Sequence, residues 1–380
     1  MKITAPWLHQ PPVRAVMAAL GNAGFQAYFV GGCVRNALIG AAASDIDIAT
    51  NAWPDQTKKA ATDAGLKTIP TGEDHGTITV VVDGQAFEVT TYRRDVETDG
   101  RRAVVAFSDN IEEDALRRDF TMNALYADAD GEVIDPVGGL DDLRARRVRF
   151  IQDPAERIAE DRLRALRFFR FHAWYGDKDA GLDPDALAAI AAAVETLPEL
   201  SKERVGTEVK KLLAAPDPVQ AAAAMEQCGA LGQVLPGAST QFLGSVVLLE
   251  AHAGLPPDPM RRLVAIGGED PKAVLRLSKS DARRLADFKQ ASALPVPEAA
   301  YRFGADTAWD SAIIMAAMVQ QPLQQDVAAQ IATGAQAEFP VKAADLPELS
   351  GKDLGDRLKA LEANWIAAGF KPSKEELLAK

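Results

Sequence analysis

The sequence predicts an α+β protein, with a head of mixed strands and helices over about the first 140 residues and an all-helical remainder. Two observations predict this division. The first stretch contains short β-rich runs, two of which flank Asp83-Gly84, a strong signal for a two-residue hairpin turn. From about Leu140, alanine, leucine, arginine and glutamate recur with helical periodicity, and prolines mark the breaks. The expected strands are 26–30, 45–50, 77–82, 85–92, 124–127 and 132–134.

Composition limits the broad class of protein. A chain of 380 residues is long enough for roughly two to four domains, and 47% hydrophobic with 25% charged residues is ordinary for a soluble globular protein. No run of apolar residues is long enough to predict a membrane span. The two cysteines, Cys33 and Cys228, are too few for a disulfide framework or a cysteine-rich zinc site. Because the first residues lack a signal-peptide core, the cytoplasm is the expected compartment.

Charge is distributed unevenly along the chain. The formal net charge of −12 argues against non-specific binding to nucleic acid. Residues 144–170, however, contain nine arginines against four acidic residues, an excess of five positive charges. A local basic stripe is typical of phosphate binding, although a solvated helix with mixed charges explains it about equally well.

A glycine pair follows the first expected strand. Residues 26–30 run into Gly31 and Gly32, and a helix is expected to begin near Val34. Glycines let backbone N–H groups approach a phosphate closely, and a helix N-terminus attracts anions. Arg35 in the first helical turn could neutralise phosphate oxygens. A plain strand-to-helix turn explains the two glycines about as well.

Three carboxylates are candidate metal ligands. Asp45 and Asp47 lie two apart in a run that alternates polar and apolar residues, so on a strand their side chains share one face. Paired carboxylates repel each other unless a cation lies between them, and oxygen ligands suit Mg²⁺. Glu88, in the second strand of the expected hairpin, could complete a two-metal site for phosphoryl transfer. Taken alone, a polar strand face is the commoner explanation of this spacing, and an exposed strand residue explains Glu88.

Six motifs, in order, support a resemblance to a known family. They are GGCVRN with the following LIG, DIDIAT and NAWP, then FEVTTYR at Phe87–Arg93, RRDFTMNAL at Arg117–Leu125, DPVGGLDDL at Asp135–Leu143, EDRLRALRFFRF at Glu160–Phe171 and KERVGTEVKKLL at Lys202–Leu213. Together they resemble the DNA polymerase β-like nucleotidyltransferases, and more narrowly the bacterial-type (class II) CCA-adding tRNA nucleotidyltransferases and poly(A) polymerases. Beyond residue 213 the chain matches only in helical character.

The resemblance implies a fold and a function. The fold is a polymerase-β-like nucleotidyltransferase head with a small mixed sheet at 1–142, a helical neck at 143–213, and a tRNA-binding helical body and tail at 214–380. The function is template-independent, two-metal addition of CMP and AMP to the 3′ end of tRNA from CTP and ATP, with Mg²⁺ as cofactor, release of pyrophosphate and no required protein partner. The implied roles are metal binding by Asp45 and Asp47 with Glu88 as third acid, triphosphate binding by Gly31, Gly32 and Arg35, and ribose recognition by Arg118, Asp119 and Asn123.

Asp161 and Arg164 are the candidate pair for reading the nucleobase. At positions i and i+3 of a helix they would share a face. A carboxylate acceptor and a guanidinium donor match the amino donor and ring-nitrogen acceptor that cytosine and adenine both present, whereas uracil and guanine present the reverse order. Each mismatch would leave a buried group unpaired, at a cost of about 1–3 kcal/mol. A surface ion pair is the plainer explanation of the spacing alone.

Two further regions support weaker predictions. Residues 93–107 are polar, and the resemblance implies a mobile loop there that takes part in the change from CMP to AMP addition, with a plain connector as the alternative. In the helical remainder the candidate phosphate contacts are Arg261, Arg262, Arg276, Lys279, Arg283, Arg284 and Lys352. These side chains could equally be solvated helix charges. His172, which lies among aromatic residues, is expected to be structural.

Competing functions stay open on the sequence alone. A poly(A) polymerase shares the head motifs but usually has a GRRF-like signature, which residues 73–82 lack. The sequence does not separate an A-adding or CC-adding enzyme from one that adds all of CCA. A catalytically inactive RNA-binding protein on the same fold belongs to another class, and the presence of both Asp45 and Asp47 argues against it. The long helical remainder argues against transfer to a small molecule.

Overall fold

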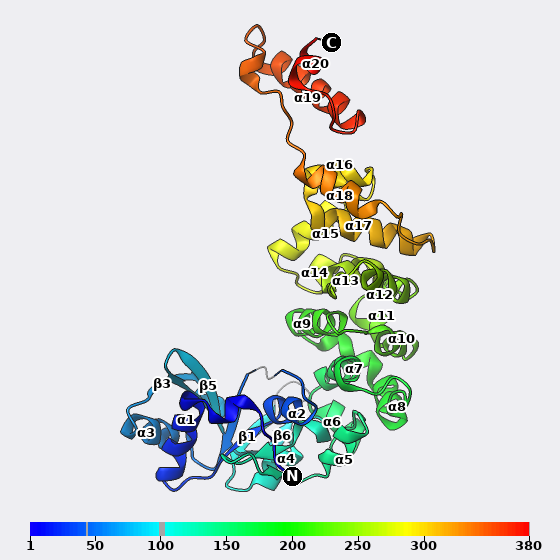
Figure 1. The fold of residues 1–380 in the computed structure, drawn as a ribbon. Coiled ribbons are helices and arrows are strands. Elements are labelled where there is room, and N and C mark those ends of the chain that lie inside the picture. Colours follow the sequence, from blue (N-terminus) through cyan, green and yellow to red (C-terminus); the bar gives the residue numbers. More distant parts are fainter. Residues whose placement is uncertain (43–44, 99–102, 380) are drawn as a thin grey trace. The chain divides into compact units, whose positions relative to one another are not determined.

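The computed structural model describes residues 1–42, 45–98 and 103–379. Their contacts divide the chain into two compact units, Met1–Pro236 and Gly237–Lys380. The first unit contains the strands and the second is built from helices, as the sequence predicts. In Figure 1 the first unit runs from blue to green and the second from green to red.

A seven-stranded mixed sheet forms the head, in the order β3-β4-β5-β2-β1-β8-β9. Its strands are β1 Ala27–Val30, β2 Asp47–Thr50, β3 Lys67–Gly72, β4 Thr77–Val82, β5 Gln85–Thr91, β8 Tyr126–Ala127 and β9 Val133–Ile134. Only β2 and β5 pair in parallel; the other neighbouring strands are antiparallel. The turn at Asp83 and Gly84 has positive φ at both residues, which is the backbone of a tight hairpin and confirms that prediction.

Sequence patterning missed β3, the strand at one edge of this sheet. Its side chains are mostly exposed, so it shows neither an apolar run nor a clean alternation. Pro70 lies within it, and proline in a strand is typical of an edge position. The strand pairs only with β4, through an irregular register near its end.

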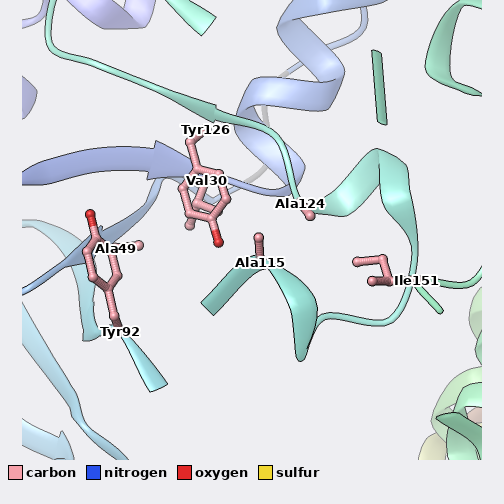
Figure 2. Close-up of a cluster of buried hydrophobic side chains, with 7 residues drawn as sticks. All are labelled: Val30, Ala49, Tyr92, Ala115, Ala124, Tyr126 and Ile151. Atoms are coloured by element: carbon pink, nitrogen blue, oxygen red, sulfur yellow. The ribbon is translucent and has the colours of Figure 1, made fainter. Parts of the chain in front are cut away.

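Helices cover both faces of the head sheet. The helical elements of the head are η1 Pro6–His9, α1 Pro11–Asn22, α2 Gly32–Leu38, α3 Pro54–Asp63, η2 Glu73–His75, α4 Ile111–Leu116, η3 Thr121–Asn123 and α5 Gly139–Arg144. Helices α1 and α3 pack against the sheet on one side (Figure 1). On that side Trp7 meets Phe29 edge-on. On the other side lies the buried cluster of Val30, Ala49, Tyr92, Ala115, Ala124, Tyr126 and Ile151 (Figure 2). Because side chains alternate along β2, Asp47 points to the same side as Ala49.

Residues 93–107 differ from the predicted polar loop. They form a separate antiparallel ribbon of β6 Arg93–Thr98 and β7 Ala103–Phe107, and the tip at 99–102 lies outside the described residues. The run of valines and alanines before Phe107 is β-rich, a signal that the count of polar residues obscured. At its base, Phe107 packs edge-on against Trp53, which follows β2.

The remainder of the first unit is helical. Its elements are α6 Pro154–Glu160, α7 Leu163–Tyr175, α8 Pro184–Ala193, η4 Val194–Glu199, α9 Lys202–Leu213, α10 Val219–Gln227 and α11 Ala230–Val234. The helix predicted across 160–171 is interrupted, since Asp161 has extended backbone angles and ends α6. His172 is buried and contacts Gln220 through its ring nitrogen, consistent with the expected structural role.

The second unit consists of helices around several small hydrophobic clusters. Its helices are α12 Leu243–His252, α13 Pro259–Ile266, α14 Pro271–Val274, α15 Lys279–Ala291, α16 Val296–Phe303, α17 Ala305–Met318, α18 Val327–Gln336, η5 Ala343–Asp345, α19 Gly351–Ala367 and α20 Lys374–Leu378. Throughout the described parts of the chain, no helix is both long and apolar enough to cross a membrane.

Two arginines of the second unit, expected as candidate phosphate contacts, are buried. Arg261 and Arg262 are only 5% and 1% exposed, and both pair with Glu250. Arg284 pairs with Asp258 and Asp310. Helical periodicity gives the face on which an arginine lies but not whether a carboxylate of another helix covers that face. The other four candidates, Arg276, Lys279, Arg283 and Lys352, are exposed.

Candidate active site

The turn between β1 and α2 has the geometry expected of a phosphate loop. Gly31 has φ +72, a conformation that side chains other than glycine rarely adopt, and α2 begins at Gly32. A Cβ atom at Gly31 would lie 3.6 Å from Nη1 of Arg118 and 3.6 Å from the carbonyl oxygen of Asn123. The turn therefore brings backbone N–H groups, the start of a helix and a guanidinium together.

Two of the three predicted acids lie opposite each other. Asp47 is the first residue of β2 and Glu88 is its partner across the parallel β2–β5 pair, so both side chains lie on one face, with backbones about 4.8 Å apart. Asp45 precedes the strand instead of lying within it, which corrects the predicted strand start. Over the described ranges, no three acidic, histidine or cysteine side chains already converge on one metal position.

The acidic pair is suited to a cation. Burial raises the pKa of Asp47, and the neighbouring charges of Glu88 and Asp45 raise it further, while Arg118 lowers it. The charges of Glu88 and Asp45 therefore disfavour the ionised form of Asp47, and a divalent cation beside it would offset that repulsion. All the donors are carboxylate oxygens, the ligands that hard cations prefer. The chemistry of these residues fits a divalent metal, which Asp45 and Asp47 could hold.

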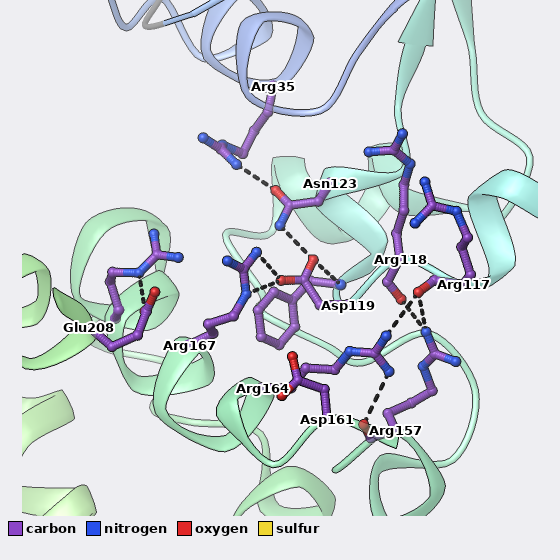
Figure 3. Close-up of polar contacts among 12 residues, drawn as sticks. Arg35, Arg117, Arg118, Asp119, Asn123, Arg157, Asp161, Arg164, Arg167 and Glu208 are labelled. Atoms are coloured by element: carbon purple, nitrogen blue, oxygen red, sulfur yellow. Dashed lines mark hydrogen bonds and ion pairs between the residues drawn. The ribbon is translucent and has the colours of Figure 1, made fainter. Parts of the chain in front are cut away.

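A buried polar chain connects the phosphate loop to the neck helix α7 (Figure 3). Asp119 accepts hydrogen bonds from Arg167 Nε at 2.7 Å and from Asn123 Nδ2 at 2.9 Å. Asn123 in turn accepts from Arg35 Nη1 at 2.5 Å. The polar atoms of Asp119 and Asn123, to which the family resemblance gives a role in ribose recognition, thus have protein partners here. Sequence reasoning missed Arg167, although it follows Arg164 by one helical turn.

The side chain of Arg35 is buried and has several protein partners, in addition to its position near the phosphate loop. Its guanidinium lies 3.9 Å from the ring centre of Tyr175, whose hydroxyl accepts a hydrogen bond from Nη2 at 2.8 Å. Nε and Nη2 also donate to Asn36. Burial lowers the pKa of Arg35, against the opposing effects of Tyr175 and Asp119. Tyr175, outside every recognised motif, joins α7 to α2 through this contact.

The candidate base-reading pair lies at a helix junction. Asp161 caps α7 by accepting from the backbone N–H of Leu163, and its other oxygen accepts from Arg204 of α9 at 2.7 Å. Arg164 pairs with Glu160 and donates to the backbone oxygens of Arg157 and Arg117 (Figure 3). The two side chains therefore have separate partners instead of sharing one continuous helix face. Arg204 and Glu160 are the partners that spacing did not reveal.

The Asp119 network has a measurable pH dependence. Burial alone would raise the pKa of Asp119, but Arg167 and Asn123 lower it from 3.8 to about 2. A lowered carboxyl pKa stabilises the fold above the unfolded-state value, and this stability is lost as the pH falls from about 4 to about 2; the shift corresponds to about 2 kcal/mol. We expect Asp119→Asn to flatten the acid limb of the unfolding free energy, measured by urea titration between pH 2 and pH 7. Parallel curves for variant and wild type would contradict this assignment.

Acids on two parallel strands, β2 and β5, beside a glycine turn are the arrangement of a nucleotidyltransferase head. The fold and the site therefore indicate the nucleotidyltransferase class. Residues 27–149 match the family described as poly A polymerase head domain, and 181–242 match the probable RNA and SrmB-binding site of polymerase A. The mitochondrial CCA tRNA nucleotidyltransferase 1 of Mus musculus is 32% identical over 367 residues, which cover 92% of this chain and 85% of that protein. The chain belongs to the family of CCA-adding tRNA nucleotidyltransferases, a group of enzymes that generally use divalent metals.

Two further comparisons agree. The Homo sapiens enzyme of the same name is 45% identical over 184 residues, or 48% of this chain. The chain spans 42% of that protein and about half of several bacterial relatives. The crystal structure of the Bacillus stearothermophilus CCA-adding enzyme in complex with CTP superimposes with a TM-score of 0.73 at 27% identity, over 97% of this chain and 96% of the other. This match extends the likeness of fold to both compact units.

Proposed function

We propose that the chain adds CMP and AMP to the 3′ end of tRNA, without a template, from CTP and ATP. The observation that carries the proposal is the Asp47–Glu88 pair on adjacent parallel strands beside the Gly31 turn, in a chain of this family. In the reaction the 3′-hydroxyl oxygen of the RNA bonds to the α-phosphorus of the nucleotide. The bond from that phosphorus to pyrophosphate breaks, pyrophosphate leaves, and the hydroxyl proton is lost to solvent.

The acids provide the metal site of this proposal. Asp45 and Asp47 would hold Mg²⁺, and Glu88 would complete the acidic face. When bound, the cations stabilise negative charge on the attacking and leaving oxygens. The residues of the chain orient the reactants: the loop of Gly31 and Gly32 receives the triphosphate with Arg35 behind it. Arg118, Asp119 and Asn123 would line the ribose of the same nucleotide.

Asp161 and Arg164 are proposed to read the base. Asp161→Ala is expected to lower the preference for CTP over UTP by about 10- to 100-fold, because the penalty for the mismatched uracil edge is lost. The measurement is kcat/KM for each nucleotide on tRNA ending before CCA. The fold should survive, since the carboxylate is partly exposed and its cap is worth only about 1 kcal/mol. An unchanged CTP to UTP ratio would remove Asp161 from the base-reading site.

The wider organisation is also proposed. The catalytic head would occupy 1–142, the helical neck 143–213, and the tRNA-binding body and tail 214–380. We expect the enzyme to act in the cytoplasm with no required protein partner. Exposed Arg276, Lys279, Arg283 and Lys352 remain candidates for phosphate contacts in the last region.

The test is incorporation of each labelled nucleotide, with Mg²⁺, into tRNA ending before CCA, in C and in CC. Two CMPs followed by one AMP and then termination are expected. AMP on the CC end alone would identify an A-adding enzyme, and CMP alone a CC-adding one. Long A tails would indicate a poly(A) polymerase, and the absence of incorporation by folded protein would favour an inactive RNA-binding protein.

A further inference from the structure

Asp114 of α4 is a buried carboxylate to which neither the motifs nor the proposed mechanism gives a role. It is 1% exposed and lies four residues before Arg118. Burial alone would raise its pKa, but the charges of Arg118 and Arg117 and the hydroxyl of Tyr126 lower it well below the usual value. Asp114 is therefore an anion with several donors directed at it.

Asp114 and Tyr126 hold one edge of the Arg118 guanidinium. Oδ2 of Asp114 accepts from Arg118 Nη2 at 2.9 Å and from Nε at 3.3 Å. The Tyr126 hydroxyl donates to the same oxygen at 2.7 Å and accepts from Arg118 Nε at 3.1 Å. These contacts fix the plane of the guanidinium, because two of its three nitrogens are held from one side.

The third nitrogen of Arg118 points toward the phosphate loop. Nη1 makes no hydrogen bond with any residue that the structure describes, and it lies 3.6 Å from the position of a Cβ at Gly31. The free end of Arg118 thus faces the glycine turn at Gly31.

Asp114 carries one negative charge, which does not neutralise both of the arginines that contact it. Oδ1 of Asp114 accepts from Arg117 Nε at 2.9 Å and from the backbone N–H of Arg93 at 3.3 Å. Two arginines thus share one carboxylate, and the group has an excess of one positive charge.

We propose that Asp114 is a positioning residue, which with Tyr126 presents Nη1 of Arg118 to the nucleotide at the phosphate loop. This inference rests on the proposed function, since it takes the ligand of that loop to be a nucleoside triphosphate. It differs from a structural role in one respect: loss of Asp114 should act on nucleotide binding only through Arg118.

A double-mutant cycle tests this dependence. The measurement is CTP binding by isothermal titration to the full chain, which is informative whether or not CMP is transferred; incorporation into tRNA tests the proposed function separately. Asp114→Asn is expected to weaken CTP binding by about 10- to 100-fold, as for loss of a hydrogen bond to a charged group. Combined with Arg118→Ala, it should weaken binding no further than Arg118→Ala alone.

Two other variants keep the test independent of folding. Tyr126→Phe removes one hydroxyl and should weaken CTP binding about 3- to 10-fold in the wild type but not in the Arg118→Ala background. Arg117→Ala removes the partner of the other carboxylate oxygen, Oδ1, and should leave CTP affinity within about 2-fold of wild type. Additive losses in the cycle, or an equal loss in Arg117→Ala, would overturn the positioning role. Folded wild type that binds no CTP would overturn both this inference and the proposed function.

Discussion

Asp47→Asn is expected to lower nucleotide incorporation by at least about 10³-fold while leaving the head folded. Asp47 begins β2 opposite Glu88, so the lost charge belongs to the acidic face that would bind the metal. Its pKa is raised by burial and by Glu88 and Asp45, which means that the folded state disfavours the ionised form. Removing that charge should leave the free energy of unfolding at pH 7 unchanged or slightly higher. Activity is thus expected to fall without a loss of stability.

The measurement for Asp47 combines incorporation kinetics with thermal unfolding in the presence and absence of Mg²⁺. Wild type should gain thermal stability from Mg²⁺, because a ligand that binds only the folded state stabilises it. Asp47→Asn should lose most of that gain. Asp63→Asn, an exposed acid on α3 that pairs with Lys59, is the matched control and should retain both activity and the Mg²⁺ effect. An Asp47→Asn variant with near wild-type rates would exclude Asp47 from the metal site.

The strands of the head were predictable because their signals are local. Alternation of apolar and polar residues depends only on neighbours along the chain, and the Asp83-Gly84 turn depends on two residues that tolerate positive φ. The family resemblance also assigned Gly31, Asp47 and Glu88 to one site before any contact was known. The pairing of β2 with β5 in the structure then gave the register, in which Asp47 lies opposite Glu88.

Contacts between distant segments were not predictable in this way. Tyr175 meets Arg35 across 140 positions, and nothing in the local sequence of either residue distinguishes that contact from a packed aromatic ring. The break at Asp161 is similar, since its carboxylate caps one helix and pairs with Arg204 of another. Charged residues keep their helical spacing across such a break, so the sequence pattern does not reveal it. The same reason explains why Arg261 and Arg262 were expected at the surface.

Glu250 is expected to be the most sensitive position for the stability of the second unit. It lies 2% exposed on α12 between two buried arginines of α13, accepting from Arg261 Nη1 at 2.9 Å and from Arg262 Nη2 at 2.7 Å. Glu250→Ala would leave these guanidinium groups with less compensation in a poorly solvated interior. Breaking a buried ion pair from one side typically costs about 3–5 kcal/mol, far more than the side chain contributes to packing. The loss in free energy of unfolding should therefore exceed the loss expected when a buried apolar side chain of similar size is replaced by alanine.

Hydrogen exchange of α12, α13 and α17, measured in the full chain, separates this local effect from unfolding of the head. Protection of these helices should fall by the equivalent of about 3–5 kcal/mol in Glu250→Ala, while the strands of the head remain unchanged. Arg283→Ala is the matched control, because Arg283 is 83% exposed and its pair with Asp287 is worth at most about 1 kcal/mol. Equal loss of protection in the two variants would mean that burial adds nothing to the Glu250 pairs. The physical distinction is that water replaces the partner of Arg283 but reaches neither Arg261 nor Arg262.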